Sequence, residues 1–353
     1  MDVTVPAHRL SAAVSAASRL LPARTGLHLR ADAAGLTVAG TAPDLAVRFG
    51  CPATTHTGGA VVVPASPLVE TLKVLDSELV RLVVEGTRLA LRLDNARFAL
   101  PLLPASDPAS DPPAQVSEVD GSAFASALRI VAGTAAKDDP LPLFTGVRLQ
   151  ASGVGLTLTA SDRYRMAVAR LPLSSPGSLD VLVPAALLSE AARQASGRVG
   201  LHAGPGRFGL SWAEGLVATA VLDAGFLSED SIPSGEVDTR VTLPADTLAA
   251  AVRRVGVYAE DRRVLTLEVG DAQVRLASAR QDTGEAEEVL KADVDGGRTS
   301  PSFQARYLLD ALAAFAGERV VLSIQPGMRA CVLRAEEPGE VELTYYLMPM
   351  LSR

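Results

Sequence analysis

The chain has 353 residues, of which 48% are hydrophobic and 21% charged, a globular composition that excludes intrinsic disorder. The formal net charge of −7 counts against a nucleic-acid partner unless the basic residues gather on one surface. This length predicts two or three domains. Because the sequence has neither a long apolar run nor a secretory signal, we expect a cytoplasmic protein with no membrane contact.

The predicted elements, taken in chain order, begin with a helix at "PAHRLSAAVSAASRLL", where Leu10 and Val14 lie four residues apart on one face. A β-hairpin is expected next at "GLHLRADAAGLTVAGT", which alternates apolar and polar residues about a turn. A second helix follows in "VVVPASPLVETLKVL", and two further strands cover Val80 to Leu93. This stretch therefore predicts a unit made of a helix, strands, a second helix and more strands.

The same order of elements recurs twice. First helices are expected at "DGSAFASALRIVAGTAA" and "PADTLAAAVRRVGVYA", and hairpins at "GVRLQASGVGLTLTAS" and "LTLEVGDAQVRLASA". The second helices, at "VLVPAALLSEAARQA" and "SFQARYLLDALAAFA", complete the pattern. Pro64, Pro184 and Gln304 start the three second helices at intervals of 120 residues (184 − 64 and 304 − 184). The chain is thus predicted to contain three related domains.

Two polar segments mark the domain boundaries. "PASDPASDPPAQ" from Pro104 to Gln115 has the composition of a solvated linker, and "FLSEDSIPSGE" from Phe226 to Glu236 occupies the corresponding place after the second unit. The predicted domains are residues 1–115, 116–236 and 237–353.

Patterns that carry catalytic chemistry are missing from the sequence. The four histidines have no metal-ligand spacing, and two distant cysteines, Cys51 and Cys331, do not form a disulfide framework. "GPGRFG" at Gly204 to Gly209 satisfies a dinucleotide fingerprint, but a strand pattern follows it, so we interpret it as a hairpin connection. Nothing supplies a nucleophile with a base. We therefore expect no cofactor and no metal, and an enzyme has only weak support from these patterns.

Basic residues recur on the first helices and on the loops that end them. If the three units are related by pseudo-symmetry, these bases share one surface, and the net negative charge is then compatible with DNA binding. The competing interpretation is a set of solvated helix faces paired with nearby acids. The basic residues are Arg9, Arg19, Arg24, Arg129, Lys137, Arg253, Arg254, Arg262 and Arg263.

The three repeats, the linker positions and the terminal "YLMPM" together resemble the bacterial sliding clamp, the beta subunit of DNA polymerase III. The most specific local similarity is "TGVRLQASGVGLTLTASDRYRMAVARL" from Thr145 to Leu171, supported by "RFALPLLPASD" from Arg97. The resemblance implies an α+β fold of three clamp domains, each with two helices packed on antiparallel sheets. It further implies a head-to-tail dimeric ring whose helices line a hole around duplex DNA, and a non-catalytic role in polymerase processivity.

The resemblance also implies partners and site residues. The partners are duplex DNA, bound without sequence preference, and the DNA polymerase III alpha subunit, the clamp loader and repair polymerases, which insert short peptides with Leu and Phe anchors into a hydrophobic groove. The groove would comprise Phe144, Ser161, Arg163, Tyr164, Arg165, Met166, Ser231, Ile232, Tyr346, Met348, Pro349 and Met350. Arg24, Lys73, Lys137 and Arg262 would face DNA. Phe98 and Leu100 would meet Val257 and Tyr258 of a second copy in the homodimer, unless these four are ordinary core residues.

Several groove positions depart from the family pattern. The usual T-D-G-H-R-L reads "SDRYRM" here, F-P-D-Y-R reads "FLSED", and Leu351 stands where arginine is common. We therefore expect altered partner selection, and hypothesise a divergent second clamp that tolerates groove-directed inhibitors. The scarcity of lysine suggests a GC-rich, actinobacterial genome. The alternative function is a clamp-like peptide-binding adaptor that no longer encircles DNA, which failure to form a closed dimer would favour.

Overall fold

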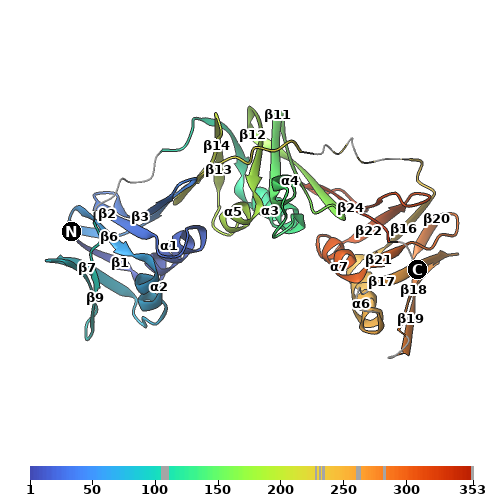
Figure 1. Ribbon diagram of the computed structural model, residues 1–353, viewed down its shortest axis with the longest axis horizontal. Helices are drawn as coiled ribbons and strands as arrows, with labels where there is room; N and C mark the ends of the chain where they lie inside the picture. Colours follow the sequence, from blue (N-terminus) through green and yellow to red (C-terminus); the bar gives the residue numbers. More distant parts are fainter. Residues whose placement is uncertain are drawn as a thin grey trace. The chain divides into compact units, whose positions relative to one another are not determined.

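The computed structural model describes residues 1–104, 111–226, 229, 232, 235–259, 264–280 and 284–350. The chain forms two compact units, whose elements are labelled in Figure 1. Unit 1 comprises Met1–Ala125, Ala151–Val154 and Leu173–Leu222. Unit 2 comprises Ser126–Gln150, Gly155–Pro172 and Asp223–Arg353.

Unit 1 contains antiparallel strands in two runs, β5-β1-β7-β8-β9 and β12-β10-β13-β14-β15-β4-β3-β2-β6. Helix α1 packs against α2, α5 and strands β3 and β4. The elements are β1 (Asp2–Pro6), α1 (Ala7–Leu20), β2 (Gly26–Asp32), β3 (Gly35–Ala42), β4 (Leu45–Cys51), β5 (Thr54–Thr57), β6 (Gly59–Pro64), α2 (Ala65–Lys73), β7 (Leu79–Glu85), β8 (Arg88–Arg92), β9 (Arg97–Pro101), β10 (Gln115–Asp120), α5 (Ala185–Ala191), β13 (Arg198–Gly204), β14 (Arg207–Trp212) and β15 (Gly215–Ala220). Three elements have residues in both units: α3 (Gly121–Thr134), β11 (Gly146–Ser161) and β12 (Arg165–Pro184).

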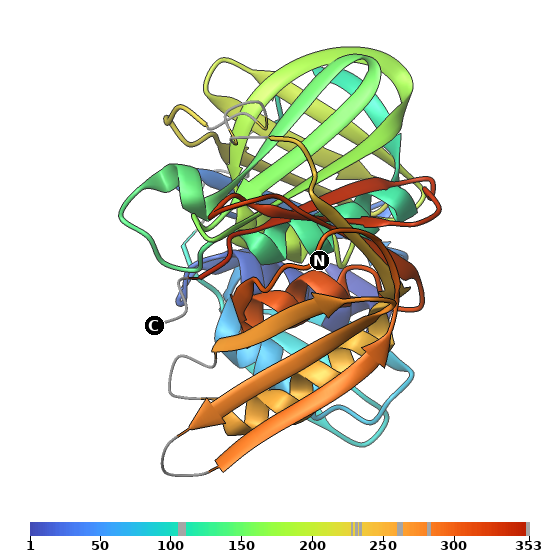
Figure 2. The same ribbon diagram turned by 90° about the vertical axis from the view of Figure 1, so that its right-hand side faces the viewer.

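Unit 2 contains the antiparallel strand orders β20-β16-β22-β23-β24-β12 and β19-β18-β17-β21. Helices α6 and α7 pack against each other, and Figure 2 shows β17, β18 and β19 (orange) side by side in front of them. The elements are α4 (Pro142–Thr145), β16 (Thr239–Pro244), α6 (Ala245–Val255), the 3₁₀-helix η2 (Gly256–Tyr258), β17 (Val264–Gly270), β18 (Gln273–Arg280), β19 (Gly284–Lys291), β20 (Asp293–Gly296), β21 (Ser302–Gln304), α7 (Ala305–Ala313), β22 (Arg319–Ile324), β23 (Cys331–Ala335) and β24 (Glu342–Leu347).

Proline joins strand to helix at four equivalent places. Strands β1, β6, β12 and β16 end on Pro6, Pro64, Pro184 and Pro244, and α1, α2, α5 and α6 begin at the next residue. The ring fixes φ near the helical value while ψ stays extended, between 124° and 130°, so the chain turns from strand to helix without a loop. This repeated junction is the structural form of the repeat seen in the sequence.

The core confirms the predicted helix faces. The exposed fraction is at most 1% for all six predicted core positions of the first helices: Leu10, Val14, Phe124, Leu128, Leu248 and Val252. Such side chains supply most of the stability of short helices, because each contributes about 1.5–3 kcal/mol on full burial.

The structure contains two of the three first hairpins that the sequence predicts. Strands β2 and β3 pair, and so do β17 and β18. The structure differs at the second repeat, where one strand, β11, runs through the expected turn, although Gly153 within it has φ of 60°. The fingerprint-like glycines join β13 to β14 with Gly204 opposite Arg207, so no helix follows them and the hairpin interpretation is confirmed.

Parts of both predicted linkers lie outside the described residues, namely 105–110 and 227–228, 230–231 and 233–234.

Among the residues that are described, no helix is both long and apolar enough to cross a membrane. Within that same set, no cluster of three or more His, Cys, Asp or Glu side chains could hold a metal ion.

The two cysteines are buried thiols and should be unreactive in the folded protein. Burial raises the pKa of Cys51 to about 12, helped by Glu214, and burial likewise raises the pKa of Cys331 to about 12. Because the thiolate is the nucleophile, labelling by a disulfide reagent at pH 8 should be about 1,000-fold slower in the native state than in urea. Rapid native labelling of either cysteine would contradict this burial.

Candidate functional site

The pairing of β12 with β24 divides the predicted groove residues between two faces of one sheet. Arg165 lies opposite Leu347, and Met166 lies opposite Tyr346. Successive side chains on a strand point to opposite faces, so Met166 and Tyr346 share one face while Arg165 and Tyr345 share the other. All described groove residues belong to unit 2. The residues predicted to line one groove therefore lie on two faces of the sheet, which the loop before β12 connects.

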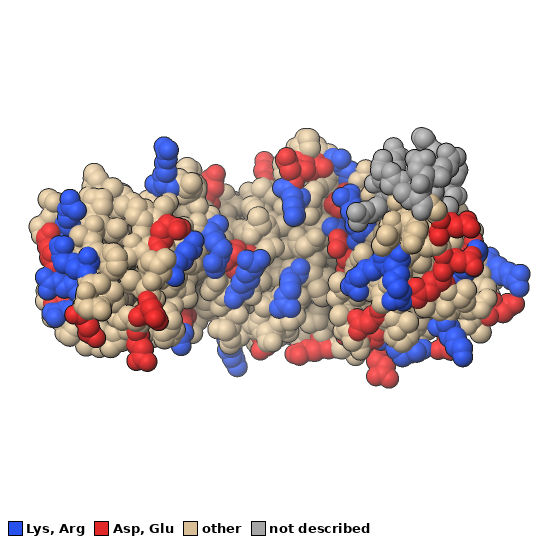
Figure 3. Space-filling model, turned by 90° about the horizontal axis from the view of Figure 1, so that it is seen from below, with Lys and Arg blue, Asp and Glu red and all other residues tan. Residues whose placement is uncertain are grey.

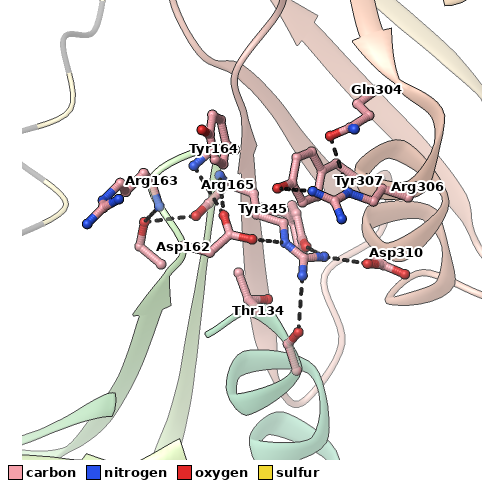
Figure 4. A network of polar contacts seen from close by, with 12 residues as sticks. Thr134, Asp162, Arg163, Tyr164, Arg165, Gln304, Arg306, Tyr307, Asp310 and Tyr345 are labelled. Atoms are coloured by element: carbon pink, nitrogen blue, oxygen red, sulfur yellow. Dashed lines mark hydrogen bonds and ion pairs between the residues drawn. The ribbon is translucent and has the colours of Figure 1, made fainter. Parts of the chain in front are cut away.

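Arg165 forms the centre of the network on the first face (Figure 4). Its Nε donates to Asp162 at 2.9 Å, one terminal nitrogen donates to Asp310 at 2.6 Å and to the Tyr345 hydroxyl at 3.1 Å, and the other donates to the Gly133 carbonyl at 3.3 Å. Burial alone would lower the pKa of Arg165, but Tyr345, Asp162 and Asp310 raise it, so the guanidinium stays charged. These contacts connect α3, α7 and β24 to the start of β12.

The loop that precedes Arg165 is held by local hydrogen bonds. The Ser161 hydroxyl donates to the Arg165 carbonyl at 2.9 Å and accepts from the Arg163 amide at 3.2 Å. One carboxylate oxygen of Asp162 accepts from the amides of Tyr164 and Arg165, both at 3.1 Å. Arg163 has φ of 77°, a left-handed conformation that glycine adopts more easily. The family glycine at this position thus matches the backbone, and arginine carries local strain.

Arg163 is fixed by contacts with two neighbours. Its guanidinium donates to Asp139 at 2.8 Å and lies 4.5 Å from the centre of the Phe144 ring. The Phe144 residue is only 7% exposed, so Arg163 covers a ring that was predicted to line the groove.

Tyr164 is 57% exposed and stacks on Tyr307, with ring centres 5.6 Å apart and planes 19° apart. Arg306 lies over the same Tyr307 ring at 4.4 Å and donates to its hydroxyl at 2.7 Å. Sequence reasoning did not include Tyr307 and Arg306 among the site residues. The sequence feature that could have identified them is their position at the start of the last repeated helix, where β21 passes directly into α7.

The second face carries a polar cluster. The Tyr346 hydroxyl donates to Glu229 at 2.5 Å, and the other Glu229 carboxylate oxygen pairs with Arg170. Burial raises the pKa of Tyr346 to about 12, and the bond to Glu229 adds to this effect. Met166, opposite Tyr346, is 5% exposed, and the Ile232 amide donates to the Glu229 carbonyl at 3.0 Å. This face therefore combines apolar and ion-paired side chains.

The tail after β24 is hydrogen-bonded to the loop before β12 and to β21. The Met348 amide donates to the Tyr164 carbonyl at 2.9 Å, and the Met350 amide donates to the Ser302 carbonyl at 2.7 Å. Met348 is 39% exposed, whereas Pro349 is buried. Ser231 lies outside the described residues. The apolar end of the sequence is thus partly core and partly surface.

The predicted DNA-facing residues differ in their pairing. Arg24 and Lys137 are exposed and form no ion pair with a described residue, while Lys73 pairs with Glu70 at 3.0 Å. Arg262 falls outside the described residues. Arg129 and Arg253, which the site prediction omitted, are also exposed and have no acidic partner in the described part of the chain. Figure 3 shows basic and acidic side chains interspersed on the side viewed there.

The four predicted dimer residues lie beside two open sheet edges. Strand β9, with Phe98 and Leu100, ends one sheet, and η2, with Val257 and Tyr258, packs against the edge strand β19 and its neighbour β18. Val257 is 75% exposed, Tyr258 40% and Phe98 39%, whereas Leu100 is 7% exposed. Leu100 thus belongs to the core of unit 1 in a single chain.

Three family models match this chain. They describe the N-terminal, central and C-terminal domains of the DNA polymerase III beta subunit, and they match residues 1–109, 118–228 and 231–351. Among curated relatives, the beta sliding clamp of Streptomyces coelicolor is 28% identical over 99% of each chain. The "Beta sliding clamp homolog GriR" of Streptomyces muensis is 26% identical, covering 83% of this chain and 81% of the relative.

Solved structures show the same fold. The sliding clamp of Pseudomonas aeruginosa bound to griselimycin matches with a TM-score of 0.91 at 21% identity, and each chain is covered completely. The beta subunit from Thermotoga maritima gives the same three values. The fold class is therefore confirmed as three α+β clamp domains.

These repeated domains define a non-catalytic replication subunit rather than an enzyme. The chain belongs to the DNA polymerase III beta-subunit family, the bacterial DNA sliding clamps that act as processivity factors. Membership implies DNA, a DNA polymerase and a second copy of the chain as partners.

Proposed function

We propose that this sliding clamp closes as a homodimer around duplex DNA in the cytoplasm, and that its domains extend over residues 1–115, 116–236 and 237–353. The observation that carries DNA contact is the set of exposed bases without acidic partners among the described residues, Arg24, Arg129, Lys137 and Arg253. Such bases can neutralise phosphates without first breaking an ion pair, and phosphate contacts carry no sequence information. Lys73 and Arg262 remain proposed contributors.

We further propose that the two surfaces around β12 and β24 receive short peptides of the polymerase alpha subunit, the clamp loader and repair polymerases. Tyr164, Met348 and Tyr346 offer aromatic and apolar surface, which suits anchor side chains. Apolar burial contributes about 25 cal/mol per Å², so small changes in the fit of an anchor alter affinity.

We propose, in addition, a divergent clamp that tolerates groove-directed inhibitors. Two features support this: Arg163 covers Phe144, and Glu229 with Arg170 places charge beside Tyr346. The chain is similar to a beta sliding clamp homolog of Streptomyces muensis, so clamp homologs occur among its relatives. The clamp of Pseudomonas aeruginosa binds griselimycin in its crystal structure, which makes griselimycin a suitable test inhibitor. Griselimycin affinity equal to that of the Streptomyces coelicolor clamp would contradict the tolerance.

The test of DNA contact is the salt dependence of binding to a short duplex. Replacing Arg24, Arg129, Lys137 and Arg253 by alanine, one at a time, should each reduce the slope of log K against log salt by about one unit. Arg88 on β8 is the matched control, since it is an exposed arginine on a strand with no acidic partner among described residues. An unchanged slope in the four variants would remove these bases from the DNA surface.

The test of encirclement is retention on circular DNA. Protein loaded by its clamp loader should remain on a nicked circular plasmid through gel filtration and should be released when the plasmid is linearised. Release from both forms at the same rate would favour the adaptor alternative, which binds peptides without enclosing DNA.

A further inference from the structure

Tyr164, Tyr307 and Arg306 form a cation–aromatic cluster beside the tail, in which Tyr164 and Arg306 are exposed and Tyr307 is buried. The two rings stack, and the Arg306 guanidinium lies 4.4 Å from the Tyr307 ring centre (Figure 4). The Met348 amide donates to the Tyr164 carbonyl, so Met348, a residue that is 39% exposed, lies next to Tyr164. Tyr164 and Met348 therefore present aromatic and apolar surface to solvent, while Tyr307, 9% exposed, supports the Tyr164 ring from the protein side.

Arg306 differs in its pairing from the other two arginines of this region. Arg163 pairs with Asp139, and Arg165 pairs with Asp162 and Asp310. The guanidinium of Arg306 instead donates to neutral oxygens, those of Gln304 at 3.2 Å and Tyr307 at 2.7 Å. No acidic side chain of the described residues forms an ion pair with it. Since a guanidinium has five N–H donors in a planar fork, Arg306 retains donors for an external carboxylate.

Aromatic contact also limits the freedom of Arg306. A guanidinium held over a ring and bonded to the ring hydroxyl loses less conformational entropy on binding than a free one, because its plane is already oriented. The exposed ring of Tyr164 offers a second contact, because aromatic side chains stack favourably at interfaces.

We propose that this cluster selects peptides in which an acidic residue lies next to the aromatic anchor. The carboxylate receives hydrogen bonds from Arg306, and the anchor ring packs on Tyr164. This inference rests on the proposed peptide groove and names the chemistry of the ligand that the groove prefers.

The experiment uses two fluorescein-labelled ten-residue peptides with Leu and Phe anchors that differ at one position beside Phe, Glu in one and Gln in the other. The intact wild-type protein should bind the Glu peptide about tenfold more tightly, because a hydrogen bond to a charged group is worth more than a neutral one. The preference should shrink as salt rises.

Variants then locate the source of the preference. Arg306→Gln should reduce the preference to within about twofold, because affinity for the Glu peptide falls by more than affinity for the Gln peptide. This difference is the coupling that a double-mutant cycle measures. Tyr164→Ala should weaken both peptides. Arg298→Gln is the matched control, since Arg298 is an exposed arginine of unit 2 that pairs with Asp271.

The outcomes separate this proposal from the proposed groove. If the wild-type protein binds both peptides equally, or if Arg306→Gln keeps the tenfold preference, the acidic selection is overturned while the groove stands. If the wild-type protein binds neither peptide, the groove itself is overturned, and the selection with it.

Discussion

Replacing Arg165 by leucine is expected to lower the free energy of unfolding by about 3 kcal/mol, because it removes one partner of a buried ionic network. The side chain is 9% exposed, and that of Asp162 is 10% exposed. Leucine would remove the guanidinium that donates to one carboxylate oxygen of Asp162 and to the Tyr345 hydroxyl oxygen. Urea denaturation followed by circular dichroism measures the change.

Two further variants test the cause. Arg165→Lys keeps the charge but cannot reproduce the planar fork that reaches Asp162 and Asp310 together, so its loss should lie between wild type and leucine. Arg298→Leu removes a pair whose side chains are 78% and 89% exposed, and should change stability by less than about 0.5 kcal/mol. Equal losses for Arg165→Leu and Arg298→Leu would show that the buried network contributes no more than a surface pair.

The helices and the repeat were predictable because both depend on local spacing. Apolar residues four apart, such as Leu248 and Val252, become buried whatever the neighbouring element is. The repeated proline before a helix acts through φ alone, which is also a local effect. The positions of the other site residues depend on strand pairing and on contacts between segments that are distant in the sequence.

Four features of the predicted sites illustrate that limit. Arg165 and Met166 are neighbours in sequence but face opposite sides, and only the strand register with β24 shows which partners each one meets. Tyr307 became part of the site through stacking on Tyr164, a contact between distant segments. Glu229 was recognised as a departure from the family, but its bond to Tyr346 depends on the folded loop. Leu100 and Phe98 lie on the same face of β9, yet Leu100 is 7% exposed and Phe98 39%, a difference that the alternation of the strand does not predict.

The second large effect is expected at the proposed ring contact. Val257→Asp should raise the dimer dissociation constant by about 100-fold or more, because burying an unpaired carboxylate in an apolar contact costs several kcal/mol. Val257 is 75% exposed in the single chain, so the substitution removes little core and the chain should still fold. Light scattering across micromolar concentrations should show a wild-type mass of about 73 kDa, twice the 36.6 kDa of one chain, and a monomer for the variant.

Val154→Asp is the matched control, since Val154 is 65% exposed and belongs to β11, which is neither of the two edge strands. It should remain dimeric and stay on circular DNA, whereas Val257→Asp should lose retention because an open ring cannot enclose a duplex. A dimeric Val257→Asp protein would place the interface elsewhere. A wild-type protein that is monomeric throughout this range would instead mean that the edges at β9 and β19 do not meet, and the peptide-binding adaptor would then become the better account of the cluster around Tyr164.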